Sequence, residues 1–254
     1  MNKFLTSILI AITSFSAVNA QSTSTAQLPA LDINLEWGPF FETGTAETRS
    51  TYSDVLDTAI ELIKAIQPKG DYLFNWKGDR TVLANKTFEI YYTFSDDKYL
   101  SAKIAQTGAT MAEQADSMTL MMKDKGKEKG SLIMLCLFAD KIFFDKNGVE
   151  RKDGLARLTV ALAYEVYSNV QMYLNYDLSP TSTKKLPTRK QSEISAFITS
   201  VNFINTVISS LESGPLSFII KEPERTKLIG DFNTALISEK LNLEYWKNVP
   251  DDTK

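Results

Sequence analysis

The sequence predicts an α+β fold, in which a small N-terminal mixed sheet with helices is followed by a three-helix C-terminal region. The first part of the chain alternates short segments of β-type periodicity with helical ones. The last part contains three long segments with helical spacing, bounded by residues that begin or end helices. Strands mixed with helices, followed by helices alone, are typical of an α+β domain.

Four segments are predicted to be strands: 31–37, 71–76, 87–94 and 132–138. Aromatic side chains alternate along the second and third segments, so they share one face of each strand. The fourth segment, LIMLCLF, is continuously apolar, which is typical of a buried strand. Its Cys136 is therefore expected to be a buried, unreactive thiol.

Helices and loops are predicted between these strands. The first helix is expected to begin at Thr51 or Ser53 and to end at Ile66, before Pro68 and Gly70. The stretch 99–123 is expected to carry a short strand and then a methionine-rich helix. The apolar positions of that helix are Met111, Ala115, Met118, Leu120, Met121 and Met122. They are expected to fill the core, although a methionine cluster can also mark an adaptable binding groove.

Three helices are predicted in the C-terminal region. The first runs from an N-cap at Asp153 over the range 153–176. The second begins with a capping box formed by Thr188 and Gln191 and ends at Gly214, before Pro215. The third covers the range 223–246. The charged run 123–130 is predicted to be a solvated loop.

The N-terminus has the features of a secretory signal peptide in residues 1–20. Lys3 lies in a short positive region, an apolar stretch follows, and small residues precede a cleavage site after Ala20. Residues 21–30 are predicted to be a flexible leader and residues 31–254 a single globular domain. The protein is thus expected to be exported to the periplasm or the extracellular space. An uncleaved anchor is the alternative, although no segment reaches the length of a transmembrane helix.

The composition excludes several kinds of chemistry. The sequence contains no histidine and a single cysteine, so it lacks the usual base of a catalytic triad and the usual nitrogen and thiolate ligands of zinc. Neither GxxxxGK[ST] nor GxGxxG occurs, and no cofactor is predicted. Without Lys3 the 28 basic residues become 27 against 31 acidic ones, which argues against nucleic acid as a partner.

Two carboxylates stand out by their surroundings. Glu165 is the one charged residue in the range 158–176, and Glu193 precedes the uncharged range 194–211. A carboxylate on an apolar helix face is costly unless it is hydrogen-bonded or functional. Each is interpreted as a structural acid held by backbone amides or by tyrosines such as Tyr164. A glycosidase-like pair of one acid and one base is the other interpretation.

The range 158–174, LTVALAYEVYSNVQMYL, resembles the active-site helix of zincin metallopeptidases. Their HExxH motif places two zinc-binding histidines one turn apart, with the glutamate as general base. Here Glu165 is kept, while Tyr164 and Ser168 stand at the histidine positions. Glu193, on the next long helix, is placed like the third ligand of the gluzincin branch. The resemblance therefore implies a degenerate zincin-like fold that has lost its zinc-ligand histidines.

Two classes of function follow from these observations. The favoured class is an exported, non-catalytic protein, a pseudo-metallopeptidase that binds a peptide or another protein through a vestigial cleft. The alternative is a metal-independent hydrolase, glycosidase-like, that uses Glu165 and Glu193 as acid and base. The arrangement of the two carboxyl groups distinguishes the classes, because a hydrolase needs both in one open cleft.

Overall fold

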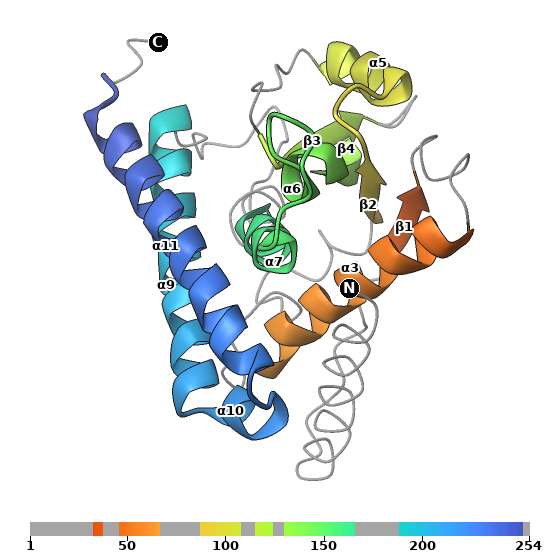
Figure 1. The fold of residues 1–254 in the computed structure, drawn as a ribbon. Helices are drawn as coiled ribbons and strands as arrows, with labels where there is room; N and C mark the ends of the chain where they lie inside the picture. Colours follow the sequence, from red (N-terminus) through yellow and green to blue (C-terminus); the bar gives the residue numbers. More distant parts are fainter. Residues whose placement is uncertain are drawn as a thin grey trace, which may run out of the picture.

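The computed structural model describes residues 33–37, 46–66, 87–107, 115–123, 130–165 and 188–250, and the fold is α+β as predicted (Figure 1). Four strands within these described ranges form a mixed sheet with the order β1 (Ile33–Trp37), β2 (Thr87–Thr93), β4 (Gly130–Phe138) and β3 (Ser117–Lys123). The first three strands are parallel, and β3 is antiparallel to β4. The predicted signal peptide, leader and strand 71–76 lie outside the described residues.

The apolar run predicted to be a buried strand is β4, between β2 and β3. Side chains alternate along a strand, so Leu135 and Leu137 point to one face of the sheet, and Cys136 and Phe138 to the other. All four are fully buried. A strand with helices over both faces needs apolar side chains at every position, which explains why its sequence does not alternate.

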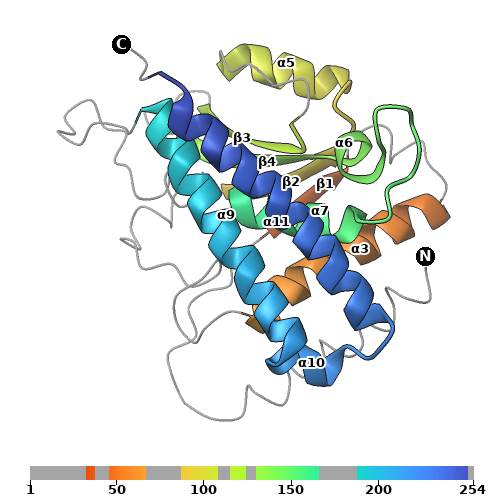
Figure 2. The same ribbon diagram turned by 60° about the vertical axis from the view of Figure 1, so that its left-hand side comes forward.

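Helices cover the two faces of the sheet in separate layers (Figure 2). Helix α5 (Lys98–Thr107) lies over one face, where Leu100 packs with Cys136 and Phe138. Helices α3 (Ala46–Ile66) and α7 (Gly154–Tyr164) lie over the other face and form the main core. A short helix, α6 (Ala139–Phe143), follows β4 directly.

The prediction for the stretch 99–123 was wrong in the order of its elements. Helix α5 comes first and strand β3 second, so Met118 lies in a strand and not in a helix. Strand β3 alternates as its pairing with β4 requires: Met118 and Leu120 pack in the cluster beneath α5, while Ser117 and Thr119 point to the opposite face. A short apolar run is compatible with the periodicity of a helix and with that of a strand. Pairing with β4 favours the extended conformation here. Met111 lies outside the described residues.

Helix α3 begins at Ala46, earlier than the predicted start at Thr51 or Ser53. Residues 46–50, which follow Gly44, contain neither glycine nor proline, so their sequence is compatible with a helix that begins at Ala46. Its end at Ile66 is as predicted.

The C-terminal helices agree with the prediction at most of their boundaries. The capping box of Thr188 and Gln191 is present at the start of α9 (Arg189–Glu212). Helix α11 (Glu224–Asn248) runs beside α9 along its length (Figures 1 and 2). Asp153 is the N-cap residue of α7, but its side chain makes no capping hydrogen bond. The predicted continuation of this helix beyond residue 165 lies outside the described residues.

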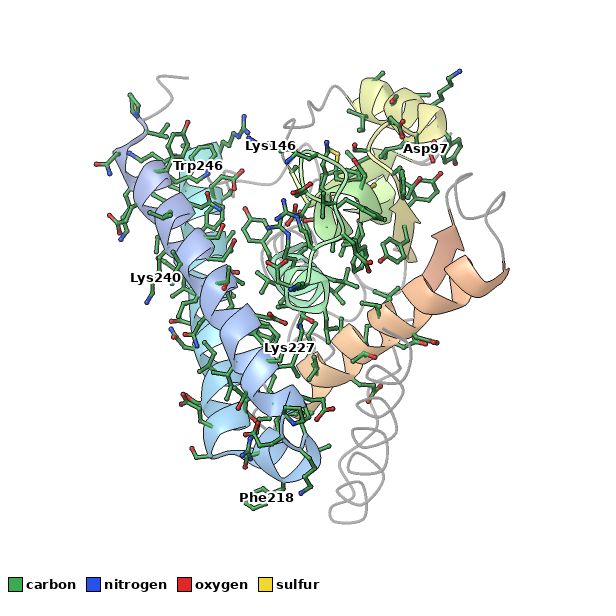
Figure 3. All side chains as sticks on the ribbon, viewed as in Figure 1. Asp97, Lys146, Phe218, Lys227, Lys240 and Trp246 are labelled. Atoms are coloured by element: carbon green, nitrogen blue, oxygen red, sulfur yellow. The ribbon has the colours of Figure 1, made fainter. Side chains whose placement is uncertain are left out.

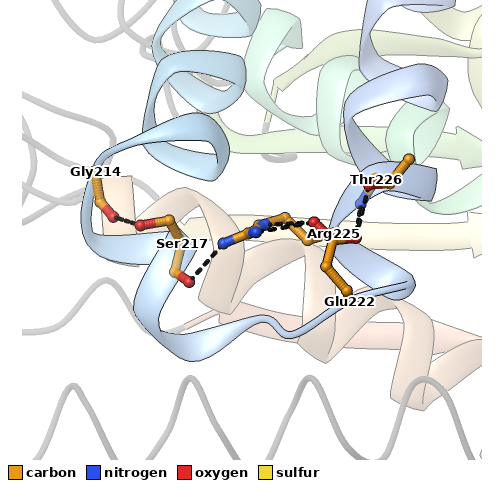
Figure 4. A network of polar contacts seen from close by, with 5 residues as sticks. All are labelled: Gly214, Ser217, Glu222, Arg225 and Thr226. Atoms are coloured by element: carbon orange, nitrogen blue, oxygen red, sulfur yellow. Dashed lines mark hydrogen bonds and ion pairs between the residues drawn. The ribbon is translucent and has the colours of Figure 1, made fainter.

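A short helix, α10 (Pro215–Ile219), joins α9 to α11, and a polar network fixes this connection (Figure 4). The Arg225 guanidinium donates to the Ser217 carbonyl oxygen at 3.0 Å and to the Glu222 carboxylate at 3.0 Å. Glu222 also accepts from the backbone amide and the hydroxyl of Thr226. These hydrogen bonds lower the pKa of Glu222, with the Thr226 hydroxyl as the largest cause.

Helix α9 is long and apolar enough to cross a membrane by length and composition, whereas no segment of that kind was expected from the sequence. It also packs within the fold, where Phe203, Ile204, Val207 and Leu211 are buried against neighbouring helices.

Candidate functional site

Glu165 caps the C-terminal end of α7, directly above strand β3. The Ser117 hydroxyl donates to its Oε1 at 2.8 Å, and the Thr119 hydroxyl donates to its Oε2 at 2.6 Å. Only 2% of the residue is exposed. The alternation of β3 creates this site, because it turns both hydroxyls toward α7 while Met118 and Leu120 face the other way.

Tyr164 and Glu193 form a direct contact between α7 and α9. The Tyr164 hydroxyl donates to the Glu193 carboxylate at 2.5 Å, and its ring packs against that of Phe197 with the centroids 5.1 Å apart. Burial first, and then the charge of Glu193, raises the pKa of Tyr164 well above its usual range. The phenol therefore stays protonated and acts as a hydrogen-bond donor.

The side chain of Glu193 is partly accessible, with 25% of its surface exposed. Arg189, one turn earlier on α9, places its guanidinium nitrogen 3.8 Å from the carboxylate. The same guanidinium lies 5.4 Å from the ring centroid of Trp246, in the last turn of α11. Arg189 thus links Glu193 to the end of the neighbouring helix.

A second polar cluster, which sequence reasoning missed, lies between α7, α9 and α11. Arg157 donates from Nη2 to both carboxylate oxygens of Asp116 at 2.6 Å. Glu239 Oε2, Ser200 Oγ and Arg157 Nε are buried and have no partner with hydrogen-bond geometry among the described residues, although the Ser200 hydroxyl lies close enough to the Glu239 carboxyl to influence its pKa. One signal was available: Arg157 is the single charged residue in the otherwise apolar sequence of α7.

The carboxylates of Glu165 and Glu193 are therefore held by different partners. Glu193 has a tyrosine partner, Tyr164, as the structural-acid interpretation expected. Glu165 accepts hydrogen bonds from two hydroxyl groups of the sheet. Ser168, the remaining position of the motif, lies outside the described residues.

These residues do not fit the zinc ion that zincin metallopeptidases bind at the corresponding positions. At the first ligand position a protonated phenol donates directly to Glu193, whereas zinc needs a neutral nitrogen or an anionic ligand there. Within the described ranges, no three Asp, Glu, Cys or His side chains are arranged to hold a metal.

Comparison of the chain with protein families, curated proteins and solved structures finds no significant match.

Burial makes Glu239 a source of pH-dependent stability. Burial raises the pKa of Glu239 above its usual 4.5, the nearby Ser200 hydroxyl and Arg157 oppose the rise, and the charge of Asp116 adds to it. The folded state thus binds the proton more tightly than the unfolded state. The stability contributed by this group is fully present below pH 4.5 and is lost as the pH rises through the folded-state pKa.

We therefore expect Glu239→Gln to remove this part of the pH dependence. The neutral amide avoids the cost of a buried charge, so the variant should be more stable than the wild type at neutral pH and equally stable at low pH. Urea unfolding at a series of pH values measures both curves. Exposed Glu212 on α9, replaced by Gln, is the control and should leave the curve unchanged. A stability difference at neutral pH that favours the wild type would contradict the prediction.

Glu165→Gln is expected to keep the fold, with a change in unfolding free energy within about 1 kcal/mol. The Ser117 and Thr119 hydroxyls can each donate or accept, so the amide oxygen and the amide nitrogen both find partners. Glu165→Leu removes both hydrogen bonds and should cost about 1–3 kcal/mol. Thermal and chemical denaturation compare the three proteins. A loss above about 2 kcal/mol for the Gln variant would mean that the ionised carboxylate itself is needed.

Proposed function

We propose that this chain is an exported, non-catalytic protein, a pseudo-metallopeptidase that binds a peptide or protein segment beside strand β3. The observation that carries the proposal is the hydrogen bond from Tyr164 to Glu193. In the zincin resemblance these are two of the three ligand positions, on two successive long helices. Their contact places the two positions side by side, with a phenol and a carboxylate bonded to each other in place of metal ligation.

The state of Glu165 supports a non-catalytic role. A general base must reach a substrate or a water molecule, whereas this carboxylate is 2% exposed and accepts hydrogen bonds from two hydroxyls. To act as a glycosidase, the protein would also need the carboxyl groups of Glu165 and Glu193 in one open cleft. Glu165 faces the sheet, and Glu193 faces Tyr164 and Arg189.

Strand β3 supplies the surface for the proposed partner. Among the described strands it is the outermost on its side of the sheet, paired with β4 alone. An extended peptide can add to such an edge, with main-chain hydrogen bonds for affinity and side-chain contacts for selection. Glu165, the neighbour of Tyr164 in the chain, contacts this strand through Ser117 and Thr119.

Hydrogen–deuterium exchange with a synthetic library of short random-sequence peptides tests the proposal. We expect slower exchange at β3 and the end of α7, no change at α5, and peptides that stay intact by mass spectrometry. Helix α5 is the internal control because it covers the opposite face of the sheet. Cleavage of the peptides, or protection confined to other elements, would overturn the proposal.

The hydrolase alternative is tested with chromogenic nitrophenyl glycosides. We expect no turnover by the wild type above the level of a Glu193→Gln variant. Turnover that disappears in Glu193→Gln while the fold is retained would establish the carboxylate pair as catalytic instead.

A further inference from the structure

Helix α11 is apolar on two opposite faces. One face carries Leu228, Phe232, Leu236 and Leu243, which are buried against the rest of the protein. The other carries Ile237, Leu241 and Tyr245, which are 62%, 66% and 67% exposed. With 3.6 residues per turn, these three lie in one row, about half a turn from the buried face. We call this row the α11 ridge.

An exposed row of this kind is unusual for a helix at the surface of a domain. Surface helices normally keep one apolar stripe toward the core and a polar face toward water. Single exposed apolar residues need no explanation, whereas a contiguous row marks an interaction surface. The i, i+4 spacing of the α11 ridge forms the type of ridge that packs into the grooves of a second helix.

The charges beside the α11 ridge make it complementary to itself. Lys240 and Glu244 lie one turn apart on the same side of Leu241, and both are exposed. Lys240 projects away from the body of the molecule and has no ion-pair partner among the described residues (Figure 3). Glu244 pairs with Lys247 at the surface. In an antiparallel pair of α11 helices, each Lys240 faces Glu244 of the other copy.

We infer that the α11 ridge is a homodimer interface, in which two copies of the chain pack their α11 helices antiparallel. A two-fold axis near Leu241 brings the two Leu241 side chains together and places Ile237 of each copy beside Tyr245 of the other. The two Lys240–Glu244 pairs fix the direction and register of the helices. One helix pair buries less than the roughly 1,600 Å² of a standard interface, so the dimer is reversible.

Sedimentation equilibrium over a range of protein concentrations tests this interface. The wild type is expected to approach a dimer as its concentration rises, and Leu241→Ser to remain a monomer. Phe218→Ser is the matched control, because Phe218 is 73% exposed on α10, away from the ridge (Figure 3). The control should dimerise like the wild type. Because the substituted residues are exposed, we expect each variant to fold. Circular dichroism verifies this.

A charge exchange separates this dimer from nonspecific association. Lys240→Glu should weaken dimerisation about tenfold, because two pairs of like charges then face each other. The double variant Lys240→Glu with Glu244→Lys should recover it, since the pairs are restored with reversed signs. A wild type that stays monomeric at all concentrations overturns the proposal, whatever other partner the ridge has. Dimerisation that is unaffected by Leu241→Ser overturns it as well.

Discussion

Replacing Arg157 with Met is expected to lower the unfolding free energy by about 2–3 kcal/mol. The substitution removes the guanidinium that donates to both oxygens of Asp116 and opposes the negative charge of Glu239. Leaving a fully buried charge unpaired costs about 3–5 kcal/mol. The expected loss is smaller because 24% of each side chain in this ion pair remains exposed. Chemical denaturation at neutral pH measures it.

A double-mutant cycle identifies the cause of that loss. Adding Asp116→Asn should recover much of the stability of Arg157→Met, because the uncompensated charge of Asp116 is then gone and only that of Glu239 remains. Lys152→Met is the matched control: Lys152 is exposed in the loop before α7, and its loss should change stability by less than about 0.5 kcal/mol. If Asp116→Asn does not recover stability, then the packing of the Arg157 side chain between α7, α9 and α11, and not its charge, is what stabilises the fold.

Zinc is expected to stabilise a variant that restores the two histidine positions of the zincin motif, Tyr164→His with Ser168→His. Glu193, now bonded to Tyr164, would supply the third protein ligand. At free zinc about a hundredfold above the dissociation constant, mass action adds about 2.7 kcal/mol. For a domain of this size that corresponds to an increase in melting temperature of about 5–10 °C. Differential scanning fluorimetry over a zinc titration measures the shift.

Two controls separate a three-ligand site from ordinary binding by a histidine pair. Glu193→Gln in the double variant should weaken zinc binding. The pair Asn202→His and Thr206→His, exposed and one turn apart on α9, should bind zinc without any dependence on Glu193. A shift in the restored variant that is indifferent to Glu193 would mean that the helices are not arranged as in a gluzincin. The proposed pseudo-metallopeptidase origin would then be wrong.

The local part of the fold was predictable because its signals lie within single segments. The capping box of Thr188 and Gln191 fixed the start of α9 before any contact was known. The apolar run of β4 indicated a strand buried on both faces. The methionine segment was misassigned because a short apolar run has no unique period, and its pairing partner is another segment of the chain.

The candidate site was predictable only in part, for a similar reason. Glu165 and Glu193 stood out because each is a charge beside a long uncharged stretch. Which groups they contact depends on strand register and on the packing of α7 against α9. The hydroxyls of Ser117 and Thr119 carry no signal in the sequence until β3 is known to be a strand with that face toward α7.

The sequence by itself determined the α+β class, most of the predicted helix boundaries, and the lack of histidine and of paired cysteines. These properties depend on residue identity and on neighbours within a few positions. Only the tertiary structure decided that Tyr164 bonds Glu193, that Asp116, Arg157 and Glu239 meet, and that one apolar face of α11 stays exposed. The physical reason is that a side chain's energy depends on groups distant in the chain, which only packing brings within contact range.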